Sequence, residues 1–221
     1  MTPDKLPVLT LRRNEERRLA AGHLWVYSNE VDTRKTPLSG FEPGSLAVIQ
    51  SSAGKTLGSG FVNPHSLICA RLLTRRPRTQ IDAGFFERRL RSALQLRDSL
   101  FDRSCYRLVY GESDGLPGLV VDRYGDVLVV QITTAGMEGV RDVLLAVLDK
   151  LLSPTAILLR NDTAMRALEG LSQEVEVIGE LPESVFVEEG GVRFEVPLSA
   201  GQKTGWFYDQ RSNRAAMHKY V

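Results

Sequence analysis

The apolar residues change their periodicity near residue 80, and this change constrains the fold more than any other feature of the sequence. From Val8 to about Thr74, short segments with alternating apolar residues recur at intervals of roughly ten residues, with glycines at their edges. This spacing is typical of a small β-barrel or sandwich. The polar segment RRPRTQIDA (75–83), which contains Pro77, then predicts a linker.

One short helix is expected inside this first unit. The segment NEERRLAAGH (14–23) offers Asn14 as an N-cap, good helix formers and a stop at Gly22. The flanking segments VLTLRR and HLWVYSNEV (23–31) are strand-like. The first unit is therefore predicted to be β-rich with a single helical insertion.

After the linker, the apolar residues follow a helical period and then return to strands. FFERRLRSALQLRDSLF (85–101) has one apolar and one charged face, which predicts an amphipathic helix. A three-stranded meander is expected over 106–134, followed by a second amphipathic helix over 137–152 and a strand at 156–161. These segments form a β-α-β layer distinct from the first unit, so we predict two domains divided near residue 80.

The last third of the sequence predicts a hairpin and a final helix. VEVIGE (175–180) is a further strand, and SVFVEEGGVRFEV (184–196) is a hairpin with its turn at Glu189-Gly190 or Gly190-Gly191. Asp209 is a suitable N-cap for a helix beginning at Gln210.

The charge is distributed unevenly between the two halves. Residues 1–80 carry 12 Lys and Arg against 6 Asp and Glu, whereas residues 81–221 carry 16 against 21. A basic first unit suits a polyanion, although solvated charge without a function explains the same numbers. Arginines can fork onto phosphates, and His and Trp rings can stack on bases. The candidate RNA-binding residues are Arg12, Arg13, Arg17, Arg18, His23, Trp25, Arg71 and Arg75. For Trp25 alone, packing in the barrel core is favoured over a role in RNA binding.

Other reactive side chains do not form a recognisable catalytic or metal motif. Glu112, Asp114 and Asp122 are carboxylates near turn sequences, and a structural role in turns is favoured over acid–base catalysis. Cys69 and Cys105 are 36 residues apart, so neither a disulfide framework nor a zinc site is suggested. We expect inert thiols and no metal.

The sequence predicts a protein of the reducing cytoplasm. No apolar run approaches the roughly 20 residues that a membrane span needs. The N-terminal segment MTPDKLPVLTLRRNEE has no apolar h-region, so we expect no secretory signal.

The stretch GQKTGWFYDQRSNR (201–214) is the strongest site-like signal. Gly201 and Gly205 allow a close approach of the backbone to a ligand, and the aromatic residues offer flat faces to an adenine. Polar side chains in the same stretch suit a carboxylate or hydroxyl groups. From the residues alone, a structural joint between loop and helix explains this stretch equally well.

Three stretches together resemble the bacterial S-adenosylmethionine-dependent methyltransferases that form 5-methylcytosine in 23S ribosomal RNA. These are GHLWVYSNEV, YRLVYGESDGLPGLVVDRYGDVLVVQ and GQKTGWFYDQRSNR, in the family's order and approximate spacing. The resemblance implies a PUA-like RNA-binding β-barrel at 1–78 and a small α/β domain at 82–182. A hairpin and the start of a Rossmann-like methyltransferase domain at 183–221 follow, with the rest of that domain missing.

The resemblance also implies a cofactor, a partner and site residues. S-adenosylmethionine is the family's cofactor, and ribosomal RNA is its substrate. The residues that match the family's cofactor edge are Gln202, Lys203, Thr204, Tyr208, Asp209, Gln210 and Arg211. The family's catalytic cysteine matches neither Cys69 nor Cys105, so no catalytic residue is assigned to this chain. We therefore expect RNA binding without methylation and little or no binding of the cofactor.

Two further expectations accompany this interpretation. The alternative to a methyltransferase portion is a free-standing RNA-binding or adaptor module that uses its C-terminal segment to contact a partner. A homodimer is compatible with either interpretation.

Overall fold

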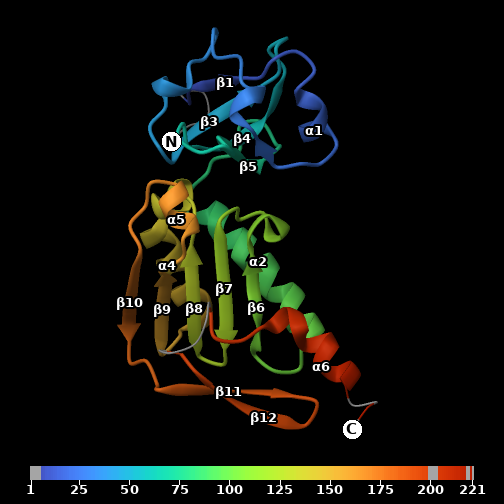
Figure 1. Cartoon of the computed structure of the whole chain (residues 1–221), viewed down its shortest axis with the longest axis vertical. Helices are drawn as coiled ribbons and strands as arrows, with labels where there is room; N and C mark the ends of the chain where they lie inside the picture. Colours follow the sequence, from blue (N-terminus) through green and yellow to red (C-terminus); the bar gives the residue numbers. More distant parts are fainter. Residues whose placement is uncertain (1–5, 199–203, 218–219, 221) are drawn as a thin grey trace.

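The computed structural model of the chain describes residues 6–198, 204–217 and 220. From top to bottom in Figure 1, the described chain forms an N-terminal β unit, a sheet backed by helices, and a hairpin beside a C-terminal helix. The α+β class predicted from the sequence is confirmed. The predicted domain boundaries fall between regular elements and remain predictions.

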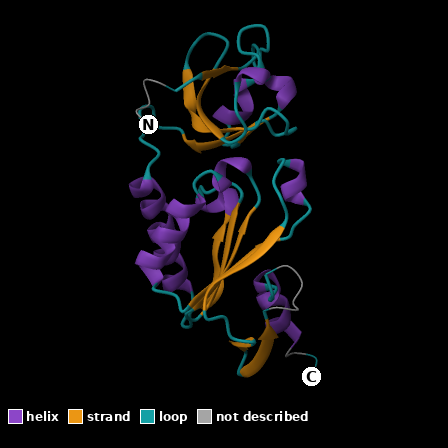
Figure 2. Ribbon diagram, turned by 90° about the vertical axis from the view of Figure 1, so that its left-hand side faces the viewer, coloured by secondary structure: helices purple, strands orange, loops and turns teal. Residues whose placement is uncertain are grey.

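The N-terminal unit is a curved sheet in the strand order β1-β3-β4-β5-β2 (Figure 2). β1 runs parallel to β3, and the other neighbours are antiparallel. Aliphatic side chains such as Leu9, Leu11, Ile49 and Leu72 are fully buried and form its core. The elements of this unit are β1 (Val8–Thr10), α1 (Glu16–Ala20), β2 (Trp25–Val26), the 3-10 turns η2 (Ser28–Glu30) and η3 (Leu38–Gly40), β3 (Ser45–Gln50), β4 (Thr56–Val62) and β5 (Ala70–Thr74).

Two local expectations for this unit were wrong. The segment 23–31 contains only the short strand β2, because the chain turns at Ser28–Glu30 around a buried carboxylate. Helix α1 begins at Glu16 and is not capped by Asn14, whose positive φ of 71° places it in the left-handed region before the helix.

The second unit is a sheet in the order β10-β9-β8-β7-β6. Strands β6, β7 and β8 form the predicted antiparallel meander, and β8 and β9 pair in parallel across a helical connection. Helices α2 and α4 cover one face of this sheet (Figure 2). The Asp82 carboxylate caps α2 by accepting a hydrogen bond from the Phe85 N–H at 2.9 Å. The elements are α2 (Ala83–Leu100), β6 (Cys105–Tyr110), the 3-10 turn η4 (Gly111–Asp114), β7 (Leu119–Tyr124), β8 (Val127–Ile132), α3 (Ala135–Glu138), α4 (Arg141–Leu152), β9 (Ala156–Asn161), α5 (Met165–Leu168) and β10 (Glu174–Gly179).

The helix predicted over 137–152 is divided into two. Helix α3 ends at Glu138 and α4 begins at Arg141, because Val140 leaves the helical backbone conformation with φ −118° and ψ 16°. The glycine that precedes it is a weak helix former. Helix α5 was not expected from the sequence.

The opposite face of the sheet is covered at one end by the predicted hairpin, β11 (Ser184–Glu189) and β12 (Val192–Pro197). Gly190 and Gly191 both have positive φ, 60° and 77°, so the turn lies at Gly190-Gly191. The 3-10 turn η5 (Tyr208–Gln210) leads directly into helix α6 (Arg211–Met217). Asp209 therefore lies inside that turn, and the predicted N-cap role for it was wrong.

The two units approach each other closely at Gly44 and at Gly136, where an added side chain would clash with the opposite unit. The apolar core of the second unit includes Phe61 from β4, whose ring lies against Gly136 of α3. A Cβ atom added to Gly136 would come within 2.1 Å of the Phe61 ring.

Within the described part of the chain, no helix is both long and apolar enough to span a bilayer.

Replacing Gly136 with alanine should lower the free energy of unfolding by about 2 kcal/mol, because the added methyl group must displace a buried aromatic ring. Gly139 is the matched control, since its negative φ suits alanine and its added Cβ would meet nothing closer than 3.6 Å. The Gly139→Ala variant should be unchanged or slightly more stable. Urea denaturation of both variants measures the difference, and equal midpoints would contradict the prediction.

Candidate functional site

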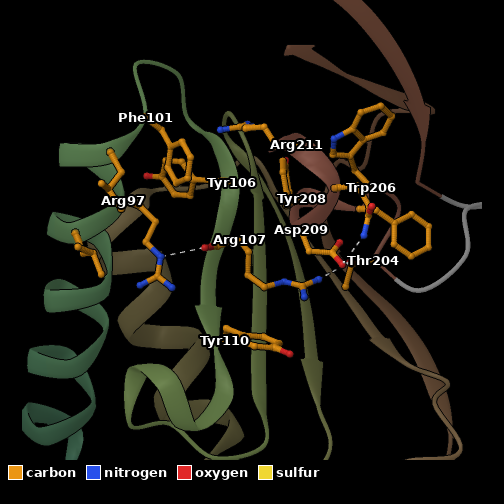
Figure 3. A pocket seen from close by; sticks show the side chains of 14 residues that line it. Arg97, Phe101, Tyr106, Arg107, Tyr110, Thr204, Trp206, Tyr208, Asp209 and Arg211 are labelled. Carbon is orange, nitrogen blue, oxygen red and sulfur yellow. Dashed lines mark hydrogen bonds between the residues drawn. The ribbon is translucent and has the colours of Figure 1, made fainter. Parts of the chain in front are cut away.

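A pocket of about 650 Å³ lies between the C-terminal half of α2, the edge strand β6 and the segment that follows the hairpin. Figure 3 shows α2 on one side, β6 in the centre and the chain from Thr204 to Arg211 on the other. This size is within the range of small-molecule sites in proteins. The lining residues are Leu96, Arg97, Leu100, Phe101, Tyr106, Arg107, Tyr110, Thr204, Trp206, Phe207, Tyr208, Asp209, Gln210 and Arg211.

The arginines of the pocket are neutralised by carboxylates of the same chain. Arg97 forms a bidentate pair with Asp114, and Arg211 donates to the Glu189 carboxylate at 3.1 Å. Because each charge is paired, these guanidinium groups position the pocket walls more than they attract an anion.

Arg107 pairs with the most buried of these carboxylates. It is directly opposite Asp122 in the strand register and donates to both carboxylate oxygens at 2.8 and 3.0 Å. Burial raises the pKa of the fully enclosed Asp122, and the hydrogen bonds from Arg107 act against that shift. Arg107 also donates to the Thr204 hydroxyl at 3.4 Å, which ties the segment after the hairpin to the sheet.

Arginine side chains also occupy the outer edge of β6. The carbonyl oxygen of Arg107 accepts a hydrogen bond from Arg97 at 3.1 Å, and that of Cys105 accepts one from Arg211 at 2.8 Å. An unpaired strand edge is a template for pairing with another chain. Here two carbonyls of the edge accept from α2 and α6, so that part of the edge is already occupied.

Aromatic faces supply the rest of the lining. Phe101 stacks on Tyr106 with ring centroids 5.4 Å apart. Tyr110 and Phe207 remain 57% and 43% exposed, and Asp209 is an exposed carboxylate. The pocket thus combines flat aromatic surfaces with polar side chains, an arrangement that suits a planar heterocycle with polar substituents.

The terminal segment is attached to the sheet by backbone and side-chain bonds. The Tyr124 hydroxyl donates to the Thr204 carbonyl, and the Tyr208 hydroxyl donates to the Arg123 carbonyl, both at 2.9 Å. Burial raises the pKa of Tyr124 and of Tyr208, which keeps both hydroxyls protonated as donors. The stretch is therefore at least a structural joint, one of the two explanations that the residues alone left open.

The predicted cofactor-edge residues divide into three groups. Gln202 and Lys203 lie outside the described residues. Thr204 is buried and Tyr208 and Arg211 are half-buried, and all three hold the segment in place. The remaining two residues, Asp209 and Gln210, are exposed on the pocket wall.

Most of the predicted RNA-binding residues lie around α1, and their side chains are at least partly exposed to solvent. Arg12, Arg13, Arg17 and His23 are exposed. The other two nearby residues have internal partners as well. Arg18 pairs with Glu30 at 2.7 Å and is 39% exposed. Arg75 donates to the carbonyls of Leu19 and His23, which fastens the end of α1 to the end of β5.

Trp25 and Arg71 lie between the two units. The Trp25 indole N–H donates to the Glu112 carboxylate at 2.5 Å, and Arg71 lies over the indole ring. Arg71 also pairs with Glu112 at 3.5 Å and with Glu169 at 3.3 Å. The favoured interpretation, packing of Trp25 in the barrel core, was wrong, because the ring is half-buried at the interface.

The carboxylates considered for catalysis all have structural partners. Glu112 and Asp114 lie in the turn η4, where they hold Arg71 and Arg97, and Asp122 holds Arg107. The favoured structural role is thus consistent with the geometry.

Neither cysteine has the environment of a nucleophile. Burial raises the pKa of the Cys69 thiol to about 12 and also raises that of Cys105, which disfavours the thiolate. Among the described residues, no three His, Cys, Asp or Glu side chains gather as a metal site would require.

Sequence reasoning missed several residues of the pocket and the interface. Arg97 and Arg107 were overlooked because each lies far in sequence from the segment that it meets. Glu169 was also missed, although it accepts bonds from Asn63 at 2.8 Å and from the Ala135 N–H at 3.3 Å. Only the Arg107–Asp122 pair was accessible from the sequence, because the turn between β6 and β7 limits their register.

Comparisons with known proteins agree with this arrangement. Residues 9–75 match the family model described as a PUA-like domain. The chain is 39% identical over 218 residues to ribosomal RNA large subunit methyltransferase I of Cronobacter sakazakii and of Escherichia coli O127:H6. The protein of the same name from Pseudoalteromonas atlantica is 35% identical over 217 residues. Each match covers 96% of this chain and 54% of the relative, so the chain spans about half the length of the curated relatives it matches.

Solved structures with the same fold have low sequence identity. One, from Streptococcus mutans and described as a SAM-dependent methyltransferase, has a TM-score of 0.76 at 18% identity and is matched over 96% of this chain and 54% of its own. A second, described as a methyltransferase complexed with SAH, has a TM-score of 0.76 at 19% identity, with coverages of 96% and 53%. The chain thus contains a PUA-like domain and is similar, over nearly all of its length, to about half of a ribosomal RNA large subunit methyltransferase I.

Proposed function

We propose that this chain is the RNA-recognition portion of an S-adenosylmethionine-dependent methyltransferase that forms 5-methylcytosine in large-subunit ribosomal RNA. The observation that carries the proposal is the 39% identity, across 96% of the chain, to proteins named ribosomal RNA large subunit methyltransferase I. The PUA-like domain at its N-terminal end supports RNA as the partner. A cytoplasmic location follows from that partner.

The surface around α1 is proposed to meet RNA. Arg12, Arg13, Arg17 and His23 are exposed there, on a unit with an excess of basic residues. Guanidinium groups bind phosphates without reading the sequence, so this surface is suited to fix affinity and register. Trp25 and Arg71 are assigned instead to holding the two units together, because their polar groups already have partners across the interface.

The pocket beside β6 is proposed to contribute one wall of the cofactor site. Its aromatic faces suit the adenine ring, and the exposed Asp209 and Gln210 suit the hydroxyl groups of a ribose. When bound, the cofactor supplies a methyl group. The chain's own part is to hold the wall, through Tyr208 and Arg211, at a fixed position on the sheet.

Methylation by this chain alone is not expected. The C5 position of cytosine needs a cysteine thiolate to add to the ring at C6. Burial raises the pKa of Cys69 and of Cys105, which keeps both side chains in the neutral thiol form. The chain is therefore proposed to bind RNA without catalysis. It is also proposed to form a homodimer, and light scattering tests this oligomeric state.

Filter binding to a fragment of 23S ribosomal RNA at several salt concentrations tests the RNA role. The affinity should fall steeply with salt, because each phosphate contact releases counterions, and replacing Arg12, Arg13 and Arg17 with glutamine should weaken it about tenfold. An absence of binding at low salt, or binding insensitive to salt, would end the proposal.

Calorimetric titration with S-adenosylmethionine should show weak or no binding.

A further inference from the structure

A second cleft, of about 800 Å³, lies between the two units on the α2 side. The loop after β5 lines one wall, the first half of α2 lines another, and the turn η4 closes the end. This cleft is separate from the pocket beside β6, with which it shares only Leu96 and no arginine. Of the residues predicted to bind RNA or the cofactor, Arg75 alone lines this cleft.

The cleft is lined by four arginines, Arg75, Arg76, Arg88 and Arg89. Arg75, Arg76 and Arg88 are exposed, and Arg89 is half-buried. Within the residues that the structure describes, none of the four forms an ion pair with a carboxylate. This contrasts with the pocket beside β6, where Arg97, Arg107 and Arg211 are all paired.

The carboxylates near the cleft are already engaged elsewhere. Glu112 accepts from Trp25 and pairs with Arg71, and Asp114 is held by Arg97 and by the Tyr110 N–H. On α2, the Asp82 carboxylate caps the helix, and Glu87 pairs with Arg91 and Lys150. The cleft therefore presents a positive charge that the described chain leaves without a counter-charge.

Arg89 is held in place before any ligand arrives. One guanidinium nitrogen donates to the Leu73 carbonyl at 3.0 Å, and the group lies over the Phe85 ring at 5.2 Å. The guanidinium also lies so close to Gly115 that a Cβ added there would come within 2.2 Å of it. Burial, and then the positive charge of Arg76, lower the pKa of Arg89, as expected when a fixed cation lacks an anion.

The loop that carries Arg76 is also fixed by hydrogen bonds. The Thr74 hydroxyl accepts from the Arg76 N–H at 3.1 Å, and the Thr79 hydroxyl donates to the Arg76 carbonyl at 3.0 Å. Two arginines of like charge thus face one cleft from different units, each on a defined backbone. A guanidinium group that is held in place, as that of Arg89 is, binds phosphate oxygens well.

We infer that this cleft binds the sugar–phosphate backbone of RNA, with Arg76, Arg88 and Arg89 as phosphate contacts. The inference rests on the proposed function, since it assumes that the partner is RNA. The cleft continues from the surface around α1, because Arg75 joins the end of α1 to the start of the cleft loop. Phe85 is only 4% exposed beneath Arg89, so the cleft offers phosphate contacts and no open face for base stacking.

The test compares two double variants that change the net charge equally. Arg76→Gln with Arg88→Gln removes two exposed cleft cations, whereas Arg91→Gln with Arg103→Gln removes two exposed cations that pair with Glu87 and Glu188 elsewhere. Filter binding to a 23S ribosomal RNA fragment should show about a 10- to 100-fold loss for the cleft variant at low salt. The slope of log affinity against log salt should become less steep by about 1.5. Thermal unfolding midpoints check that both variants are folded.

Each outcome decides between the two proposals. If the cleft and control variants bind RNA equally well, the cleft is not a phosphate site, while loss of binding in the α1 variants would leave the proposed function standing. If the unaltered chain binds no RNA, the proposed function fails first. Vesicles containing anionic lipid are a parallel arm, and cleft-dependent binding to vesicles in place of RNA would overturn the inference.

Discussion

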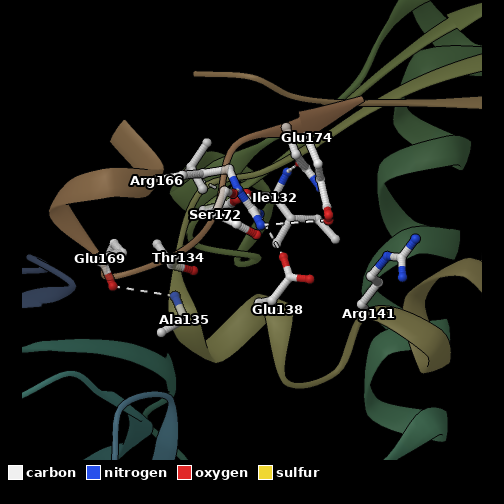
Figure 4. A network of polar contacts seen from close by, with 12 residues as sticks. Ile132, Thr134, Ala135, Glu138, Arg141, Arg166, Glu169, Ser172 and Glu174 are labelled. Atoms are coloured by element: carbon white, nitrogen blue, oxygen red, sulfur yellow. Dashed lines mark hydrogen bonds and ion pairs between the residues drawn. The ribbon is translucent and has the colours of Figure 1, made fainter. Parts of the chain in front are cut away.

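Replacing Arg166 with methionine should lower the free energy of unfolding by about 3–5 kcal/mol, the largest stability loss that we expect from a single substitution. The Arg166 side chain is only 1% exposed and is among the largest fully buried side chains of the described residues. Figure 4 shows it extending from α5 between Glu138, Ser172 and Glu174. Its burial is unusual because an isolated buried charge is costly unless it is paired and hydrogen-bonded.

The loss is large because four groups depend on this one side chain. Its guanidinium donates to the Ile132 carbonyl, the Ser172 carbonyl and the Glu138 carboxylate, each at 2.6 Å, and pairs with Glu174 at 3.9 Å. Methionine fills a similar volume but leaves the buried Ile132 carbonyl and the partly exposed Glu138 carboxylate without this donor, and an unsatisfied buried acceptor costs about 1–3 kcal/mol. Lysine keeps the charge but lacks the planar fork, so Arg166→Lys should recover only part of the stability.

Urea denaturation of the whole chain measures the effect, with Arg91→Ala as the control. Arg91 also forms an ion pair, with Glu87 at 2.8 Å, but it is 51% exposed and on a helix surface. Its removal should leave the midpoint nearly unchanged. The prediction is wrong if the Arg166→Met and Arg91→Ala variants unfold at similar urea concentrations.

The Arg166 network also explains why α5 could not be predicted. The sequence around residues 165–168 is too short for a helical period to show, and the helix is held by distant groups on β8 and α3. Its neighbour Glu169 reaches across to Asn63 and Arg71 of the first unit. These are contacts between residues about 100 positions apart, and periodicity reports only on neighbours within a few residues.

Local patterns succeeded where the local sequence decides the structure. The meander β6–β8 was predictable because its strands alternate around turn residues, and the hairpin turn was predictable because Gly190-Gly191 tolerates positive φ. The stretch 201–214 was singled out as site-like, and its role as a ligand site stays a prediction. Tyr208 and Arg211 suit either a ligand or an anchor, and only their partners Arg123 and Cys105 show the anchor.

Removing the Glu189 carboxylate should release the C-terminal segment from the sheet. Glu189 ends strand β11 and accepts hydrogen bonds from Trp206 at 3.1 Å, Arg211 at 3.1 Å and Arg214 at 2.7 Å. Its side chain is only 7% exposed. A single carboxylate thus holds both the pocket wall and helix α6.

For Glu189→Ala we expect a local loss of about 2–4 kcal/mol, because two half-buried guanidinium groups lose their counter-charge. Amide hydrogen exchange of residues 211–217 should accelerate by about 30- to 1,000-fold, while exchange in β7 and β8 stays slow. Glu188→Ala is the matched control, since the adjacent Glu188 pairs with the 65% exposed Arg103. Equal acceleration in both variants would show that Glu189 is not the anchor.

The same contact should make the segment sensitive to acid. Burial alone would raise the pKa of Glu189, but the hydrogen bonds from Arg214, Trp206 and Arg211 outweigh it, so the pKa lies below its ordinary value of 4.5. A carboxyl group whose pKa is lowered by folding contributes its full stability above the unfolded pKa and loses it as the pH falls through the folded value. Exchange of α6 should therefore accelerate in the unaltered chain as the pH falls below the ordinary glutamate pKa of 4.5. The Glu189→Gln variant, already without the charge, should lack that acid step, and an identical pH profile in both proteins would exclude Glu189 as its cause.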